Sequence, residues 1–384
     1  MKRGRLAQMK SLNISLRCAV SLLLGVGLSV GARAGDWSLQ STVTGKTDLN
    51  DNFRLKPVSS GIVIGSLTDI NADLAYSTHN SRFDLIGDLA YQKYLGPADV
   101  AAFDHLTPHL TAKYNVRGKT DSLDLAANYS VDDASTVDPL DPLGFIKGIN
   151  RTVWSGSFSY SKKLDARNFI GTSESLQDVI YSDTSTGAKP SLTANMSAFW
   201  NYRLTKSTDL RTSVNYQWQN IYSAPFTTNI IYGIRSDLTS QITKNLKLKL
   251  GAGPRFSNTS SVGFVADAGL DYQYKRGSIG LTLSRSFDPS ALGDLQQHTS
   301  IGISANNQYN EETSLGLSAQ YRFTTGLGAA DSNAITINPT LKYQIARNWS
   351  MLTGYQWTRS ESITGVAFAD DIYLSFTRNF VLDK

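Results

Sequence analysis

The chain has 384 residues, of which 41% are hydrophobic and 18% charged, and its single cysteine is Cys18. Six of the 37 basic residues and none of the 32 acidic residues lie in the first 34 positions, so the remainder has a formal net charge of −1 instead of +5. This balance excludes a basic nucleic-acid-binding protein, and a mature chain without thiols excludes disulfides, thiolate metal sites and cysteine catalysis.

The first 34 residues predict a secretory signal peptide. Its positive region contains Lys2, Arg3, Arg5, Lys10 and Arg17. An uncharged apolar run follows at 19–30, and the sequence Ala-Arg-Ala at 32–34 has the small-x-small pattern of a cleavage site. The run is too short for a spanning helix, which needs about 18 apolar residues or more. We therefore expect 1–34 to be removed on export and 35–384 to form the mature barrel domain.

From residue 35 onward, apolar and polar residues alternate in segments of about ten, the pattern of strands with one apolar face. Short charged or turn-forming breaks separate alternate segments. They lie at 78–82, 117–121, 162–168, 204–210, 243–245, 275–277, 310–313 and 346–348. Longer breaks fall between them, for example at 132–150, 182–190 and 324–333.

These breaks predict the strand count. Eight short turns imply sixteen paired strands, and a first strand near 36–45 with a last near 368–380 brings the count to eighteen. A closed antiparallel barrel needs an even count with both termini on the short-turn side. The predicted fold class is therefore all-β, a transmembrane antiparallel β-barrel of about 18 strands with short periplasmic turns and longer external loops. Sixteen strands is the alternative, because strand boundaries read from sequence slip by several residues.

The apolar face has two interpretations, since a soluble sandwich shows the same periodicity as a membrane barrel. Aromatic residues distinguish them. Near the short turns lie Tyr76, Tyr114, Tyr160, Tyr202, Tyr274, Tyr309 and Tyr343. Near the opposite strand ends lie Tyr91, Tyr129, Trp218, Phe256, Phe287, Phe323 and Trp357. Two aromatic girdles around an aliphatic band are typical of membrane barrels, whereas a soluble core buries its rings mid-strand.

The opposite face is polar, as in the segment 107–115, where Thr107, His109, Thr111, Lys113 and Asn115 share one side. A strand in hydrocarbon must pair its backbone groups, so the sheet must close. The polar face then lines a lumen, and sixteen to eighteen strands enclose one wide enough for an aqueous channel.

Ten charged residues on the polar register are candidate pore-lining positions. The acidic ones, on early strands, are Asp69, Asp73, Asp84, Asp88 and Asp124. The basic ones, on the ninth to eleventh strands, are Arg211, Arg235, Lys247, Lys249 and Arg255. In an eighteen-strand ring the two sets lie roughly opposite each other and would set up a transverse field. The alternative is that these charges pair with neighbours or with water.

No catalytic, cofactor or metal site is predicted. The histidines His105 and His109 share a face but stand about 13 Å apart along a strand, too far for one metal ion. They are interpreted, with His79 and His298, as ordinary polar residues. No nucleophile and base occur in a known catalytic spacing. The aspartates at 132–141 match no calcium-loop spacing, and the prolines at 139 and 142 favour an exposed loop over a cation site.

The segment "TDLNDNFRL" at 47–55, followed by "PVSSGIVIG", resembles the opening of a group of outer-membrane barrels often encoded near exopolysaccharide synthesis and export genes. The resemblance implies a role in moving or anchoring surface polysaccharide. The C-terminus departs from the usual barrel pattern of a terminal aromatic read by the assembly machinery. Phe376 and Phe380 fit that pattern, but Val381, Leu382, Asp383 and Lys384 follow.

We therefore expect a polar, water-filled pore in the outer membrane of a Gram-negative bacterium, passing small solutes or exporting surface polysaccharide. The loop at 132–150 is the candidate for a segment that folds into the pore. The alternative is a plugged structural barrel that anchors or docks exopolysaccharide or its export machinery. The expected partners are outer-membrane lipid and lipopolysaccharide, the barrel assembly machinery, and polysaccharide or other small solutes, without nucleic acid.

Overall fold

A computed structural model describes residues 35–53, 55–59, 61–97, 104–133, 149–184, 188–222, 227–258, 263–289, 295–326, 331–362 and 365–383. The predicted signal peptide at 1–34 and most of the predicted pore loop, residues 134–148, lie outside the described residues. The first half of the ring comprises β1 (Asp36–Asn50), β2 (Val63–Ser77), β3 (Ser81–Leu95), β4 (His105–Arg117), β5 (Asp121–Asp133), β6 (Asn150–Lys163), β7 (Asn168–Tyr181), β8 (Ser191–Arg203) and β9 (Thr208–Ile221). The second half comprises β10 (Thr227–Thr243), β11 (Leu246–Ser257), β12 (Gly263–Tyr274), β13 (Gly277–Pro289), β14 (Leu295–Gln308), β15 (Thr313–Gly326), β16 (Ser332–Ala346), β17 (Trp349–Ser362) and β18 (Gly365–Asp383).

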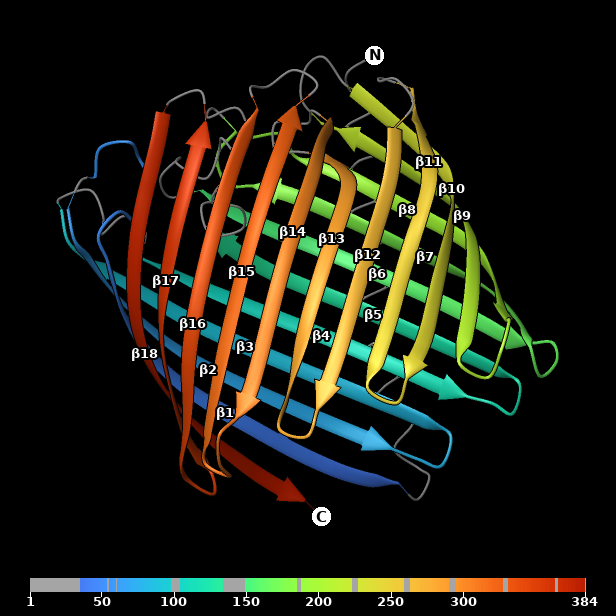
Figure 1. Ribbon diagram of the computed structural model, residues 1–384, viewed down its shortest axis with the longest axis horizontal. Coiled ribbons are helices and arrows are strands. Elements are labelled where there is room, and N and C mark those ends of the chain that lie inside the picture. The colour runs from blue at the N-terminus through green and yellow to red at the C-terminus, as the bar shows by residue number, and fades with distance from the viewer. Residues whose placement is uncertain are drawn as a thin grey trace.

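The strands form one closed antiparallel barrel. Each strand pairs with the next along the chain, and β1 also pairs with β18 from Ser38↔Asp383 to Asn50↔Asp371. Figure 1 shows β1–β9 as the far wall and β10–β18 as the near wall. The prediction of an all-β barrel with eighteen strands is confirmed, and the alternative count of sixteen is wrong.

All eight predicted short turns are confirmed, at 78–80, 118–120, 164–167, 204–207, 244–245, 275–276, 309–312 and 347–348. They lie together along the lower edge in Figure 1, where the chain also ends after β18. Polar side chains close several of them. In the β6–β7 turn, the Asp165 carboxylate accepts hydrogen bonds from the backbone N–H of Arg167 (2.7 Å) and of Asn168 (2.9 Å).

The strands have 12 to 19 residues, longer than the 9–11 that suffice to cross a membrane at a tilt. The hydrogen-bonded pairing between strands therefore continues beyond the apolar band towards both ends of the barrel. Among the described residues, no helix is long and apolar enough to cross a membrane.

The outer face of the barrel is apolar and exposed, with aromatic rings near both ends of the strands. At the short-turn end, the ring centroids of Trp37 and Tyr76 are 4.7 Å apart, and Tyr76 packs with Phe83. At the other end, the ring centroids of Tyr129 and Trp154 are 4.4 Å apart. Mid-strand positions between these rings hold exposed aliphatic residues, for example Ile279, Leu281, Leu283, Ile301, Ile303, Leu315 and Leu317. A soluble barrel would not expose such a continuous apolar belt.

The segment 47–55 that carries the family resemblance closes the seam between the first and last strands. Asn52 is 5% exposed, and its amide donates to the carbonyl oxygens of Lys56 and Phe368, both at 2.7 Å. The Oδ1 atom of Asn52 accepts from the backbone N–H of Lys56 at 3.2 Å. The carboxylate of Asp51 accepts from the backbone N–H of Asp370 at 2.7 Å. The loop after β1 is thereby tied to β18.

Candidate functional site

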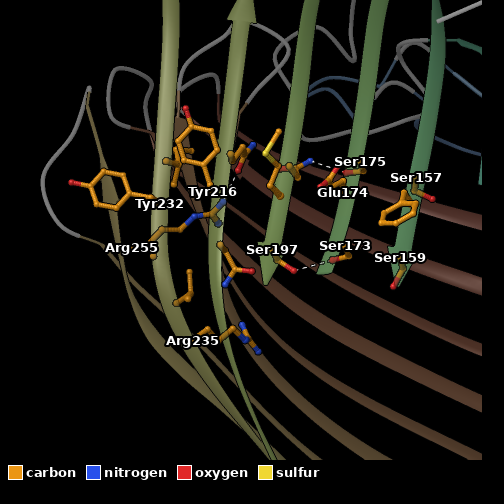
Figure 2. Close-up of a pocket in the computed structure, with 18 of the residues that line it drawn as sticks. Ser157, Ser159, Ser173, Glu174, Ser175, Ser197, Tyr216, Tyr232, Arg235 and Arg255 are labelled. Atoms are coloured by element: carbon orange, nitrogen blue, oxygen red, sulfur yellow. Dashed lines mark hydrogen bonds between the residues drawn. The ribbon is translucent and has the colours of Figure 1, made fainter. Parts of the chain in front are cut away.

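Two rows of hydroxyl and amide groups cross the inner face of β6–β9. Register places Ser157, Ser175, Asn195 and Gln217 directly opposite one another on successive strands, and likewise Ser159, Ser173, Ser197 and Asn215. Ser173 and Ser197 share a 2.9 Å hydrogen bond, and the Asn195 amide donates to Ser175 at 3.2 Å. Figure 2 shows these serines on neighbouring strands, with Arg235 and Arg255 on the adjoining part of the wall. We call the two sets of four the polar rows.

A cavity of about 730 Å³ lies along this wall, and the polar rows contribute to its lining. Its inward-facing charged residues are Lys113, Asp124, Arg235 and Arg255, whereas Glu174 and Arg285, which also border the cavity, stand on the outward register of β7 and β13. The guanidinium of Arg255 is fixed across the wall, since it donates to Oε1 of Gln217 (2.5 Å) and to the carbonyl oxygen of Phe287 (3.1 Å). Such fixed donors hold the charge in one place on the cavity wall.

A second cavity of about 690 Å³ continues towards the short turns. Asn215 and Arg235 line both cavities, so the two hollows adjoin along the β8–β10 wall. The second cavity also contains Phe169, Asn201 and Arg211. Together the two cavities extend along the inside of the wall from its upper part to its short-turn end.

The five acidic candidates share the inner register of β2, β3 and β5, and three of them have cationic or histidine neighbours. Asp84 pairs with Arg82 at 2.7 Å, and Asp124 pairs with Arg117 at 3.0 Å. Asp88 lies 3.7 Å from Nδ1 of His109, whose Nε2 contacts the Asp132 carboxylate at 2.7 Å.

The other two acidic candidates, Asp69 and Asp73, differ. Each has a buried Oδ1 atom without a hydrogen-bond partner in the described part of the chain. Both carboxylates belong to β2, which therefore has two acidic side chains facing the inside of the barrel.

The basic candidates lie on β9–β11, but carboxylates neutralise two of them. Arg235 pairs with Asp237 at 2.7 Å and also with Asp267. Lys249 pairs with Asp271 at 3.2 Å. The charges of this wall are therefore partly compensated in place.

Gly251 makes the Arg235 cluster possible, because it stands between Asp237 and Asp267 in the register. A Cβ atom at Gly251 would collide with both carboxylates and with the guanidinium. Pairing with neighbours was the alternative that the sequence left open, and the structure shows it for Arg235 and Lys249, although the sequence did not identify the partners. The available signal was the Arg-x-Asp spacing at 235–237, which puts both side chains on one face.

Of the other three basic candidates, Arg255 donates to Gln217 and Phe287, whereas Arg211 and Lys247 have no ion pair among the described residues. Arg211 lies over the ring of Phe199, with its guanidinium carbon 3.8 Å from the ring centroid. Lys247 stands opposite Gln241 and Asp271 in the register. The structure thus gives four of the ten candidates, Asp84, Asp124, Arg235 and Lys249, an oppositely charged neighbour, and it places Asp88 beside His109.

Metal binding finds no geometric support in the described ranges, where no three His, Cys, Asp or Glu side chains gather around one point. His109 is held between two aspartates, and His298 contacts the Thr324 hydroxyl at 3.0 Å.

The barrel is similar to solved structures of outer-membrane β-barrels. The siderophore receptor PirA from Pseudomonas aeruginosa matches with a TM-score of 0.51 and 9% identity, over 89% of this chain and 80% of the receptor. OccAB4 from Acinetobacter baumannii matches with a TM-score of 0.51 and 10% identity, over 90% of this chain and 98% of OccAB4. The FrpB iron transporter from Neisseria meningitidis (F5-1 variant) matches with a TM-score of 0.53 and 10% identity, over 86% of this chain but only 64% of the transporter. At these identities the likeness shows the fold alone.

No curated protein matches the sequence significantly. A family model described as "Protein of unknown function, DUF481" matches residues 187–378, which run from the β7–β8 connection into β18. That span is half of the 384-residue chain, and the chain belongs to this family.

Proposed function

We propose that this chain is an outer-membrane pore through which small polar solutes pass passively. The observation that carries the proposal is the pair of adjoining cavities inside a closed ring of eighteen strands, lined by the polar rows and by fixed charges. Water-filled barrels of this size conduct solutes when their inner face is polar. The apolar outer belt with aromatic rings supports a membrane location, with the short turns on the periplasmic side.

Passage of a polysaccharide is the second candidate, and the polar rows favour it. Eight hydroxyl or amide side chains stand in register on four neighbouring strands. Sugar hydroxyls exchange hydrogen bonds readily with such a lattice, because each group both donates and accepts. The mixed charges of the lumen fit a neutral or weakly charged chain better than a strongly anionic polymer.

Liposome swelling tests the pore. Purified protein is reconstituted into liposomes, which are diluted into isotonic solutions of neutral sugars of increasing size, with protein-free liposomes as the control. An open lumen predicts swelling rates that fall steadily from pentose to trisaccharide. Folded protein that gives no swelling with any sugar would contradict the pore and support the alternative of a plugged, anchoring barrel.

A further inference from the structure

One transverse row of the inner wall, close to the short turns, combines an apolar ring, an amide and a guanidinium. Register places Phe169 of β7 opposite Asn201 of β8, and Asn201 opposite Arg211 of β9. All three residues line the cavity of about 690 Å³. The row lies close to the turns at 164–167 and 204–207, at the short-turn end of the barrel.

The guanidinium of Arg211 lies over an aromatic ring and remains exposed. Its carbon lies 3.8 Å from the centroid of the Phe199 ring. The ring in turn occupies the space above Gly171, its direct partner on β7, where a Cβ atom would meet the ring at 2.4 Å. An arginine stacked on an aromatic face keeps its N–H edge available for a planar acceptor. Arg211 is also exposed to the lumen.

Arg211 differs from the other arginines of this cavity. Arg203 pairs with Asp209 at 3.3 Å, and Arg235 pairs with Asp237 and Asp267. Asp237 stands directly opposite Arg211 in the register, but its carboxylate is engaged by Arg235 at 2.7 Å. Within the described residues, Arg211 makes no ion pair. Both the charge of Arg211 and its pair of parallel N–H donors are therefore available to a ligand in this cavity.

Hydroxyl and amide groups line the cavity that contains this guanidinium. Ser213, Asn215 and Thr239 line the same cavity. The Oδ1 atom of Asn201 is covered and has no hydrogen-bond partner among the described residues, and an unpaired buried acceptor costs free energy. A ligand hydroxyl that reaches this oxygen would donate a hydrogen bond to it. Phe169 offers an apolar surface beside these polar groups.

We propose that Arg211, Phe199 and Asn201 form a binding subsite in the lumen for the carboxylate of a small hydroxylated solute, such as a sugar acid. The carboxylate accepts two parallel N–H bonds from Arg211, one hydroxyl of the solute donates to Oδ1 of Asn201, and its other hydroxyls meet Asn215 and Thr239. Paired charge-assisted hydrogen bonds of this kind combine affinity with recognition of a planar shape. The subsite deepens the proposed function and rests on it for access to the lumen.

Saturation-transfer NMR on the detergent-solubilised, folded barrel tests the subsite without requiring conduction. The probes are glucuronate, glucose and inorganic phosphate. The wild type should bind glucuronate saturably, while glucose binds at least tenfold more weakly and phosphate competes poorly. The variants Arg211→Gln and Arg211→Lys should each weaken glucuronate binding about tenfold, the first by removing the charge and the second by removing the fork.

Two further variants separate this subsite from a general effect of charge. Arg117→Gln removes one positive charge at the same end of the barrel. Arg117 pairs with Asp124 and does not line the cavity that contains Arg211, so this variant should leave binding within twofold of the wild type. Phe199→Leu keeps every charge but removes the support under Arg211, and should weaken binding severalfold. Mobility on unheated gels verifies that each variant is folded.

Three results would overturn the subsite: equal binding by wild type and Arg211→Gln, equal losses in Arg211→Gln and Arg117→Gln, or phosphate competing as strongly as glucuronate. A barrel that passes sugars in liposomes but does not bind glucuronate would contradict the subsite alone. A barrel that binds glucuronate but passes no solute would support the subsite and contradict the proposed pore.

Discussion

Asn52 shows how one residue outside the strands stabilises barrel closure. Its amide bridges the loop after β1 to the carbonyl of Phe368 in β18, across the seam where the first and last strands meet. It also bonds both backbone groups of Lys56. A buried amide with three partners leaves several groups unsatisfied when it is lost.

Replacing Asn52 with alanine should therefore lower the free energy of unfolding by about 2–3 kcal/mol, measured by urea titration in liposomes. Asn52→Asp keeps the acceptor for Lys56 but loses both donated bonds, and should destabilise the barrel to a similar extent. An unchanged denaturation midpoint for both variants would show that the seam does not depend on this loop.

Glu174 is a charged residue in the middle of the apolar outer face. It stands mid-strand in β7, directly between Phe158 and Met196 of the neighbouring strands, with the apolar register on both sides. A carboxylate facing hydrocarbon carries a desolvation cost, smaller than that of a lysine or arginine at the same depth.

Glu174→Leu should consequently raise the free energy of unfolding in liposomes by about 1–2 kcal/mol. The matched control is Glu311→Leu in the β14–β15 turn, which faces water and should change stability by less than about 0.5 kcal/mol. Destabilisation by Glu174→Leu would mean that a polar partner, and not lipid, covers this position.

At the scale of the element, the hairpins are set by turn chemistry as much as by the alternating pattern. The backbone N–H of Arg167, the side chain of Asn168 and the backbone N–H of Asn168 hold the pKa of the Asp165 carboxyl below its usual value. Such bonds favour the ionised carboxylate, so they stabilise the β6–β7 hairpin only while Asp165 is charged.

Asp165→Ala should destabilise the barrel at neutral pH, and the difference from wild type should vanish in acid. A lowered pKa means that the contribution is complete above the ordinary value of 3.8 and disappears as the pH falls through the lower folded value. Urea midpoints of both proteins at about pH 7 and about pH 2 measure this difference. A difference that persists at the lower pH would show that the charge of Asp165 is not what closes the turn.

The hairpin of β12 and β13 shows what alternation can and cannot predict. The apolar positions Phe264 to Tyr274, the turn at 275–276 and the resumed pattern from Ile279 fix which face points outward. The register is then set because a slip by one residue would turn every side chain to the wrong face. Strand ends were less predictable, since pairing continues past the apolar band, where composition gives no signal.

At the scale of the whole molecule, the charge distribution depends on contacts that no single strand reveals. The choice of partner by Arg235 requires three strands in register and a glycine at position 251 that leaves room between two carboxylates. Sequence reasoning could place Arg235 on the polar face but could not identify Asp267, 32 residues later, as its neighbour. The stacking of Arg211 on Phe199 was equally hidden, because it depends on Gly171 of a third strand.

We predict that the acidic candidates on β2, β3 and β5 and the basic candidates on β9–β11 influence the ion selectivity of the lumen in opposite directions. Neutralising Lys247, Lys249 and Arg255 together with glutamine should shift ion selectivity towards cations, since Asp271 would lose its partner at the same time. The reversal potential in a salt gradient across a planar bilayer measures the shift. An unchanged reversal potential would contradict a transverse electric field across the lumen.

Single-channel recording of the purified chain in a planar bilayer tests the open lumen most directly. Discrete current steps are expected, with a conductance that rises in proportion to salt concentration, as in a wide aqueous pore. Addition of protein unfolded by heat serves as the control. A bilayer that stays silent after insertion of folded, heat-modifiable barrel would contradict the central claim that the polar inner face encloses a water-filled path.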